Sequence, residues 1–317
     1  MAKLNFLKDY NINDWTAPAL PEEIPHGDMP GDKVEIDENH VAKAGKIFPE
    51  LLKMLKDMAL EGRDRAVITV CGGSGVGKSE IASLLSFYFN ELGIGSYTMS
   101  GDNYPRRIPM YNDAERLRIF RESGIEKMIE DGVYTEERFE TLHQYQLDGD
   151  DANRKHVAEN PWFKSYLEGG IAGLKGYLGT MNESGFEKVE AILDKFKAGE
   201  NHIWLKRMGR TDTELWYSDV DFSDTGILII EWTHGNSDNY KGVDIPVLLN
   251  STPQETLAHR RARNRDGKTD SPFTMRVLEV EQGMLHAQAK KAKIIVSKAG
   301  ELLTYEQYLD IMKDQEI

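Results

Sequence analysis

The sequence predicts an α/β fold, in which a parallel β-sheet is covered by helices on both faces. Short apolar runs rich in β-branched residues, such as AVITVC at 66–71, alternate with segments of helical periodicity. These runs are apolar throughout, as is typical of strands buried on both faces of a parallel sheet. A glycine-rich loop also stands directly between one such strand and a helix. The composition, 40% hydrophobic and 29% charged, is that of a globular protein.

The first 62 residues predict an extension that precedes the sheet. Four prolines within thirteen residues predict an extended arm, and they are Pro18, Pro21, Pro25 and Pro30. Apolar residues then recur at helical spacing over 41–58. Pro49 is expected to kink this helix or to mark a restart, and Gly62 to end it. We therefore assign residues 1–62 to an arm and a helix that packs on the core.

After residue 62, strand and helix patterns alternate. Strands are expected at 66–71, 95–100, 226–231, 245–250 and 292–296. Helices are expected at 80–90, 252–265, 272–291 and 305–313. A mostly helical stretch intervenes, with helices expected at 113–130, 136–147, 162–178 and 185–197. We therefore expect one core domain over 63–317 with a helical insertion at about 111–200.

The composition limits the classes of partner. The chain has 39 Lys and Arg against 53 Asp and Glu, a net charge of −14, which disfavours nucleic acid and anionic membranes. No apolar run approaches the ~20 residues that span a bilayer, and the first residues lack the pattern of a signal peptide. The single cysteine, Cys71, excludes an internal disulfide. We expect a cytoplasmic protein with neither nucleic acid nor membrane as partner.

One segment departs from this acidic balance. Residues 253–293 carry nine basic and five acidic side chains, a local charge of +4, which leaves −18 for the rest of the chain. Such a segment could be a solvated helix face or the place where an anionic ligand is held.

The strongest motif is GGSGVGKS at 72–79, an intact GxxxxGK[ST] phosphate loop. Glycines let backbone N–H groups turn toward phosphate oxygens, and the following helix presents its positive end to the same anion. Lys78 reaches the β- and γ-phosphates, and the Ser79 hydroxyl coordinates Mg²⁺. The loop predicts a P-loop NTPase-type sheet and a nucleotide site that comprises Gly72, Gly73, Ser74, Gly75, Val76, Gly77, Lys78, Ser79 and Glu80.

Other motifs narrow the class of P-loop protein. The NKxD motif of GTPases does not follow the loop, and an LSGGQ-like transporter signature is absent. The phosphate loop near residue 75 and the arginine-rich segment near residue 260 suit a small-molecule kinase.

Four stretches resemble the uridine kinase/phosphoribulokinase family of P-loop kinases. They are VCGGSGVGKS (70–79), SGDNYPRR (100–107), GILIIE (226–231) and VLLNSTPQETLAHRRARNRDG (247–267). The resemblance implies ATP as phosphate donor and Mg²⁺ as cofactor. It also implies that Asp102, in the sequence Asp-Asn-Tyr, is the catalytic base, and that Glu231 serves Mg²⁺.

The resemblance further implies an arginine lid that closes over the ATP phosphates. The arginines that match it are Arg260, Arg261, Arg263 and Arg265. Arg261 and Arg265 share one helix face, and we expect these two to reach phosphate.

The acceptor side departs from the family. Trp232 follows Glu231 where the family usually has glycine, and it could reshape the acceptor pocket or stack on the substrate. The nearest counterpart of the family's acceptor motif is LKRMGR at 205–210. Arg106 and Arg107 could hold an acidic acceptor or pair with acidic neighbours. The candidate acceptor-binding residues are Tyr104, Arg106, Arg107, Arg210, Trp232 and His234.

We therefore expect an ATP-dependent kinase that phosphorylates a hydroxyl of a nucleoside, sugar phosphate or related small metabolite. The alternative is a nucleotide-dependent regulator or scaffold on a kinase fold that has lost transfer. Intact Lys78, Ser79, Asp102 and Glu231 argue against this alternative. The helical insertion is expected to cap the acceptor or to join two copies in a homodimer.

Overall fold

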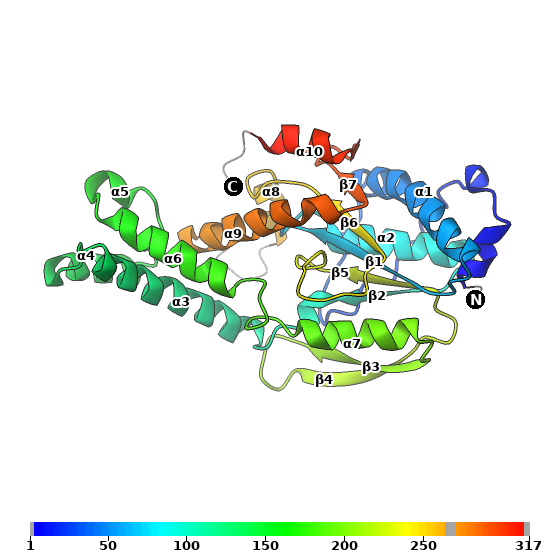
Figure 1. Ribbon diagram of the computed structural model, residues 1–317, viewed down its shortest axis with the longest axis horizontal. Coiled ribbons are helices and arrows are strands. Elements are labelled where there is room, and N and C mark those ends of the chain that lie inside the picture. Colours follow the sequence, from blue (N-terminus) through cyan, green and yellow to red (C-terminus); the bar gives the residue numbers. More distant parts are fainter. Residues whose placement is uncertain (1–2, 264–270, 314–317) are drawn as a thin grey trace.

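A six-stranded sheet forms the centre of the computed structural model, which describes residues 3–263 and 271–313 (Figure 1). Its strands are β1 (Ala66–Gly72), β2 (Ser96–Ser100), β5 (Ile227–Glu231), β6 (Ile245–Leu249), β7 (Ile294–Val296) and β8 (Leu302–Leu303). Their order is β2-β5-β1-β6-β7-β8, and every pair is parallel except β7–β8. The predicted α/β fold with a parallel sheet is thus confirmed, with a short antiparallel strand added at one edge.

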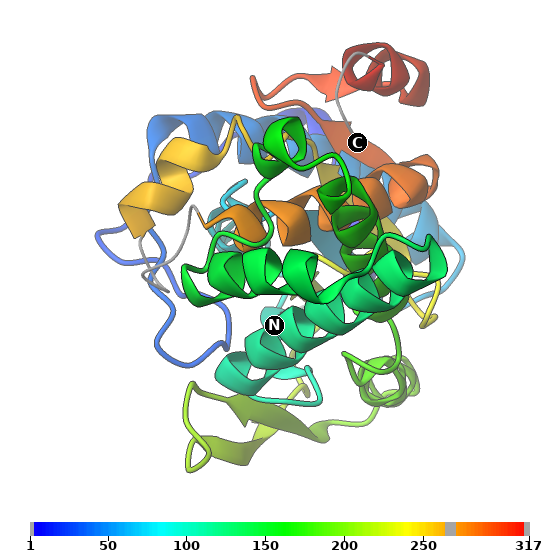
Figure 2. The ribbon, with the colours of Figure 1, turned by 90° about the vertical axis from the view of Figure 1, so that its left-hand side faces the viewer.

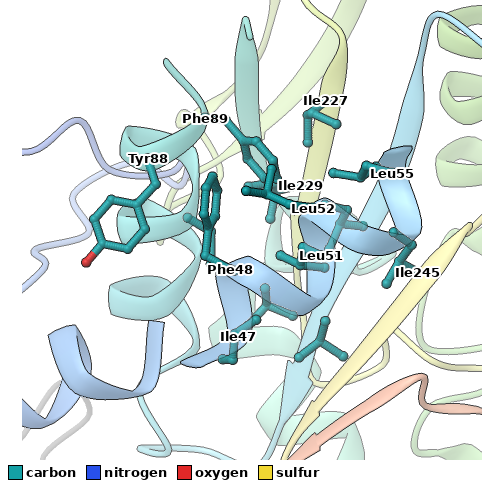
Figure 3. Packing of buried hydrophobic residues seen from close by; sticks show 14 of the residues in the cluster. Ile47, Phe48, Leu51, Leu52, Leu55, Tyr88, Phe89, Ile227, Ile229 and Ile245 are labelled. Atoms are coloured by element: carbon teal, nitrogen blue, oxygen red, sulfur yellow. The ribbon is translucent and has the colours of Figure 1, made fainter. Parts of the chain in front are cut away.

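One face of the sheet is covered by α1 (Glu38–Leu60) and α2 (Lys78–Glu91). Alternate strand residues such as Ile68 and Ile229 point toward these helices, and Figure 3 shows Ile229 beside Phe48, Leu52 and Phe89. The alternation follows from the pleat of a strand, in which successive side chains point to opposite faces. The apolar spacing predicted over 41–58 is therefore the face of α1 that is buried against the sheet.

Helix α1 is longer than predicted and continues through Pro49. It begins with a capping box, in which the Asp37 carboxylate accepts from the His40 N–H while the His40 ring bonds the Asp37 N–H. Pro49 lies inside this single helix, so the expected restart does not occur.

The opposite face of the sheet is covered by α7 (Phe186–Lys197) and by a hairpin of β3 (His202–Met208) and β4 (Leu215–Asp221). Helix α7 was predicted as the last piece of the insertion, but it packs against the sheet next to Leu228 and Ile230. The hairpin was not predicted at all.

The insertion projects away from one edge of the sheet (Figures 1 and 2). Its helices are α3 (Pro109–Glu130), α4 (Glu136–Leu147), α5 (His156–Glu159) and α6 (Phe163–Tyr177). Helices α3 and α6 pack side by side, and glycines permit their close approach. A Cβ on Gly170 would lie 2.5 Å from the Phe120 ring. Three of the four helices predicted between 111 and 200 therefore form this projection.

The chain returns to the sheet through α8 (Leu257–Arg263), α9 (Pro272–Gln288) and α10 (Tyr305–Met312). Helix α9 contacts α6 and so connects the projecting helices with the core. Short 3-10 turns occur at Leu4–Lys8, Ile12–Asp14, Gly101–Asn103 and Ala289–Lys291. Among the described residues, none of the helices combines the length and apolarity that a membrane span requires.

Candidate active site

The carboxyl ends of β1, β5 and β2 lie side by side, because these three strands are parallel neighbours. Strand β1 leads into the phosphate loop (residues 72–79), β2 leads to Asp102, and β5 ends at Glu231. In the sheet register Glu231 pairs with both Val70 and Ser100. Ligands of open α/β sheets bind outside such carboxyl ends, where the strand order reverses.

The phosphate loop has the backbone that its glycines predict. Gly75 and Gly77 adopt left-handed φ angles of 75° and 96°, which favour glycine, and Gly77 caps the start of α2. The Lys78 ammonium donates to the Gly73 carbonyl at 3.1 Å and so lies over its own loop. The N–H groups at the start of α2 and this cation together form an anion-binding position. Cys71 is buried beside the loop, and burial raises its pKa to about 11, which suits packing and not nucleophilic chemistry.

Glu231 connects the phosphate loop with the end of β2. Its carboxylate accepts from the Ser79 hydroxyl at 3.1 Å and from the Ser100 hydroxyl at 2.6 Å. The residue is 5% exposed, and burial together with the charge of Asp102 raises its pKa to about 7. A cation between Ser79 and Glu231 would offset that unfavourable burial, and hydroxyl and carboxylate oxygens are the ligands that Mg²⁺ prefers. The donor set therefore fits the predicted magnesium site.

Asp102 is exposed on a turn, Gly101–Asn103, that directly follows β2. The turn is held from below by Trp232, because a Cβ on Gly101 would lie 2.0 Å from the indole ring. Trp232 is 1% exposed and packs against Phe186 and Tyr240. Of the two roles left open by the sequence, this burial favours shaping the pocket over stacking on a substrate.

A cleft of about 340 Å³, here called the Asp102 cleft, is lined by Asp102 and Glu231 together with the phosphate loop. The sequence-predicted site residues that the structure brings together in it are Ser74, Gly75, Gly77, Lys78, Ser79, Asp102, Arg210, Glu231, Trp232 and His234. They come from the phosphate loop, from the ends of β2 and β5, and from the loop that follows β3.

The lining of the Asp102 cleft also includes polar residues that the sequence did not single out. They are Asp32 of the arm, Asn112, Asp113 and Arg116 of α3, Glu183 and Ser184 before α7, and Glu281 of α9. These segments are far apart in the sequence and carry no motif. Only the fold places them together.

Among these residues, Glu183 bonds both Asn112 and Arg116. Its side chain is buried and accepts from Asn112 at 3.1 Å and from the Gly179 N–H at 2.6 Å, and it pairs with Arg116 at 2.6 Å. Burial would raise the pKa of Glu183, but Arg116 and His234 outweigh that effect and lower it. For Glu281 the balance is reversed: burial outweighs the opposing charges of Arg116 and Lys78 and raises its pKa to about 7.

Three candidate acceptor-binding residues, Tyr104, Arg106 and Arg107, are not among the residues that line this cleft. Tyr104 is buried in the core beneath the turn. Arg106 donates to the Met181 carbonyl and pairs with Glu187 at 3.0 Å. Arg107 bonds the Tyr177 hydroxyl at 2.9 Å and pairs with Glu115. The alternative of pairing with acidic neighbours therefore describes both arginines.

The predicted lid is only partly within the described residues. Arg260 is buried and donates to the Pro253 carbonyl at 2.6 Å, and its stem lies against Gly75, where a Cβ would be 2.9 Å from its Cγ. Arg261 is exposed on α8, and Arg265 lies outside the described residues. Within the described part of the chain, Arg260 is thus an arginine that lies against the phosphate loop, and it is on the helix face that the sequence did not favour.

A second cleft, of about 800 Å³, lies on the other side of the phosphate loop and is here called the lysine cleft. It is lined by the loop from Gly75 to Gly77, by Glu80, by the arm and the start of α1, and by the turn at 298–300. Its lysines are Lys33, Lys43, Lys46 and Lys298. Burial and the charge of Lys298 lower the pKa of Lys43.

Comparison with known proteins finds no matching family model. The chain is 38% identical over 265 residues to the bifunctional α-galactosidase/sucrose kinase AgaSK of Mediterraneibacter gnavus. The alignment covers 84% of this chain and 23% of that protein, so the chain spans about a quarter of its relative's length.

Two solved structures are also similar in part. A protein assigned as a fructose transport system kinase from a Silicibacter species matches with a TM-score of 0.44 and 12% identity, over 80% of this chain and 96% of that one. A protein assigned as a uridine kinase from Bacillus stearothermophilus matches with a TM-score of 0.33 and 14% identity, over 73% and 88%. The parallel sheet and the intact phosphate loop agree with the predicted P-loop kinase fold, and most of the chain is similar in sequence to part of a protein named as a sucrose kinase.

Proposed function

We propose that the chain is an ATP-dependent kinase that transfers the γ-phosphate of Mg-ATP to a hydroxyl of a small, neutral sugar. The observation that carries this proposal is the Asp102 cleft, where Lys78, the Ser79–Glu231 pair and Asp102 line one space. The sucrose kinase activity for which the AgaSK relative is named makes sucrose the first acceptor to test.

The chain's own residues account for the chemistry of this transfer. The phosphate loop and Lys78 hold the β- and γ-phosphates, so that the terminal phosphorus lies toward Asp102. The exposed Asp102 carboxylate orients the acceptor hydroxyl and takes its proton as the new O–P bond forms. Phosphoryl transfer passes through a loose transition state, so positioning and electrostatic stabilisation supply most of the catalysis.

Ser79 and Glu231 would hold Mg²⁺, which when bound neutralises charge on the phosphate oxygens. Among the residues that the structure describes, no group of three or more His, Cys, Asp or Glu is arranged to hold a metal ion. This agrees with magnesium in kinases, which is usually held by one or two carboxylates together with waters and substrate phosphates.

The positions of the two clefts indicate on which side of the phosphate loop each end of the nucleotide lies. Gly75 and Gly77 line both clefts, so phosphates held by the loop lie at the boundary between them. The acceptor must lie on the side of Asp102. The adenosine part then occupies the lysine cleft, whose volume of about 800 Å³ is large enough for a base and a ribose.

The charge of the Asp102 cleft selects among acceptors. Beyond the phosphate loop and Glu231, its ionisable lining is Asp32, Asp102, Asp113, Glu183 and Glu281 against Arg116 and Arg210, with His234 beside them. Carboxylates accept hydrogen bonds from hydroxyl groups and repel anions. A neutral, hydroxyl-rich sugar is therefore favoured over the sugar phosphate that the sequence left open.

An acceptor screen that measures ADP release tests this function. Sucrose, its constituent monosaccharides, nucleosides and sugar phosphates are each supplied with Mg-ATP. We expect ADP release to depend on a neutral sugar and to be slow with phosphorylated acceptors. If Mg-ATP binds but no acceptor accelerates ADP release, the regulator alternative replaces the kinase.

A further inference from the structure

The N-terminal arm reaches the end of β2, directly behind the Asp102 turn, at Asp28. The side chain is 7% exposed, and each carboxylate oxygen has two donors. Oδ1 accepts from the Ser100 N–H at 2.7 Å and from Asn103 Nδ2 at 3.0 Å. Oδ2 accepts from the Tyr97 hydroxyl at 3.0 Å and lies 2.9 Å from Arg207 Nη1. The carboxylate is thus a junction between β2, the turn that carries Asp102, and β3.

The residues that bond Asp28 are themselves bonded to, or adjacent in sequence to, the groups that carry out the proposed chemistry. Ser100, whose N–H is fixed by Asp28, donates its hydroxyl to Glu231 at 2.6 Å. Asn103 adjoins Asp102, and its side-chain oxygen accepts from the Met208 N–H at 3.0 Å. One carboxylate therefore fixes both ends of the Gly101–Asn103 turn.

Residues around Asp28 show that the arm is seated on the site. A Cβ on Gly27 would lie 3.3 Å from Thr98 Cγ2 and 4.0 Å from Glu231 Cγ, so the arm backbone runs directly against the ends of β2 and β5. Met29 and Asp32 then line the Asp102 cleft itself. The arm was expected only to be extended, and no role was assigned to it.

We propose that Asp28 is a positioning residue of the kinase, which holds the Asp102 turn and, through Ser100, Glu231 in their reactive geometry. It does not touch the reacting atoms. The inference rests on the proposed function, because its effect is on the rate of phosphoryl transfer. A displacement of about 1 Å of a catalytic group can cost roughly 100-fold in rate, so a residue that fixes the turn matters to catalysis.

A purely structural ion pair would behave differently, and the chain offers a matched example. Asp151 pairs with Arg121 at 2.9 Å and accepts from the Tyr166 hydroxyl at 2.7 Å, so it also joins one arginine and one tyrosine. It is similarly buried but lies among the projecting helices. Asp151→Asn therefore removes the same kind of buried carboxylate charge, but at a position away from the cleft.

The test compares Asp28→Asn with Asp151→Asn, using unfolding temperature, Mg-ATP affinity, and the kcat and KM of transfer to an acceptor that the wild type phosphorylates. Both variants are expected to lower the unfolding temperature. Only Asp28→Asn should lower kcat, by on the order of 10- to 100-fold, with the KM for ATP changed by less than about 3-fold. When Asp102 is already replaced by asparagine, Asp28→Asn should lower kcat little further, because both changes act through the Asp102 carboxylate.

Removal of Asp28 alone leaves the Arg207 charge buried and unpaired, which can destabilise the fold strongly. If Asp28→Asn does not fold, the double variant Asp28→Asn/Arg207→Met serves instead, because it removes both buried charges. The same loss of kcat is expected for this double variant. Wild-type kcat in either folded variant, or losses that multiply fully with Asp102→Asn, would overturn the positioning role. Absence of transfer by the wild type itself would instead refute the proposed function.

Discussion

Asp102 is exposed at the end of β2, whereas Glu183 and Glu231, which line the same cleft, are buried and bonded. An exposed carboxylate can approach a substrate hydroxyl without first breaking internal hydrogen bonds. The position of Asp102 after β2 could be predicted from the sequence, because the strand and turn patterns there are local. The burial of its neighbours could not be predicted, because that burial depends on packing by Trp232 and the arm.

Asp102→Asn should fold and bind Mg-ATP as the wild type does, since the side chain is exposed and asparagine is nearly isosteric. It removes the proton acceptor, so kcat should fall by about 10²- to 10⁴-fold. Steady-state kinetics and calorimetry check the two parts. Asp310→Asn, an exposed carboxylate on α10, serves as the control with unchanged kcat. A turn residue alone would tolerate asparagine, so wild-type kcat would remove the catalytic-base role.

Glu281 makes a prediction about pH. Burial raises its folded-state pKa to about 7 from 4.5, so the carboxyl is neutral in both states at low pH. As pH rises between these two values, the unfolded chain loses the proton first, and the native protein is progressively destabilised. Glu281→Gln removes this penalty. Its unfolding temperature should match the wild type near pH 4.5 and exceed it increasingly toward pH 7. A difference that does not change with pH would show that the folded-state pKa of Glu281 is not raised.

At the scale of elements, local patterns predicted most of the secondary structure and missed what depends on distant partners. Strands β1 and β5 were found because each is an uninterrupted apolar run. The β3–β4 hairpin was missed because its β4 strand, LWYSDVD, is largely exposed and lacks a buried face. The position of helix α7 in the sequence was predicted correctly. Its packing on the sheet was not, because that packing depends on contacts with the distant residues Leu228 and Ile230.

The insertion contributes to the site through α3 and through the segment before α7. Asn112 and Arg116 come from α3, and Glu183 binds both. This arrangement supports the predicted acceptor-side cap. The contact between two copies stays a prediction.

The lid remains a prediction about α8 and the residues that follow it. Arg261→Ala combined with Arg265→Ala should lower kcat more than it weakens ATP binding, because lid charges act mainly in the closed state. Arg118→Ala, an exposed arginine on α3, is the matched control. If the double variant matches that control in both kcat and ATP affinity, the basic segment is only a solvated helix face.

At the scale of the whole molecule, nucleotide binding should stabilise the fold. A ligand that binds only the native state raises the unfolding temperature, because it stabilises that state by RT ln(1 + L/Kd), where L is the free ligand concentration. Mg-ATP should therefore raise the unfolding temperature of the wild type, and Lys78→Ala should abolish most of that rise. Lys53→Ala, an exposed lysine on α1, should retain it. An equal rise in Lys78→Ala would exclude the phosphate loop as the nucleotide site.

The fold brings one sheet edge, the arm, the insertion and α9 to a single cleft. The sequence predicted the part that the sheet edge supplies, since the phosphate loop, Asp102 and Glu231 each follow a recognisable strand. It did not predict Asp28, Glu183 or Glu281, because these belong to an arm, a loop and a helix without a motif. The acceptor side of the site is thus the part that needed the three-dimensional structure.

The central claim is that the Asp102 cleft transfers phosphate to a sugar hydroxyl. Phosphorus NMR of the products from Mg-ATP and sucrose, at matched saturation for the wild type and Asp102→Asn, tests it most directly. The account predicts a new sugar phosphomonoester signal that grows in step with ADP for the wild type, and its loss by about 10²- to 10⁴-fold in the variant. ADP accompanied only by inorganic phosphate, or no turnover with any neutral sugar despite tight Mg-ATP binding, would contradict it.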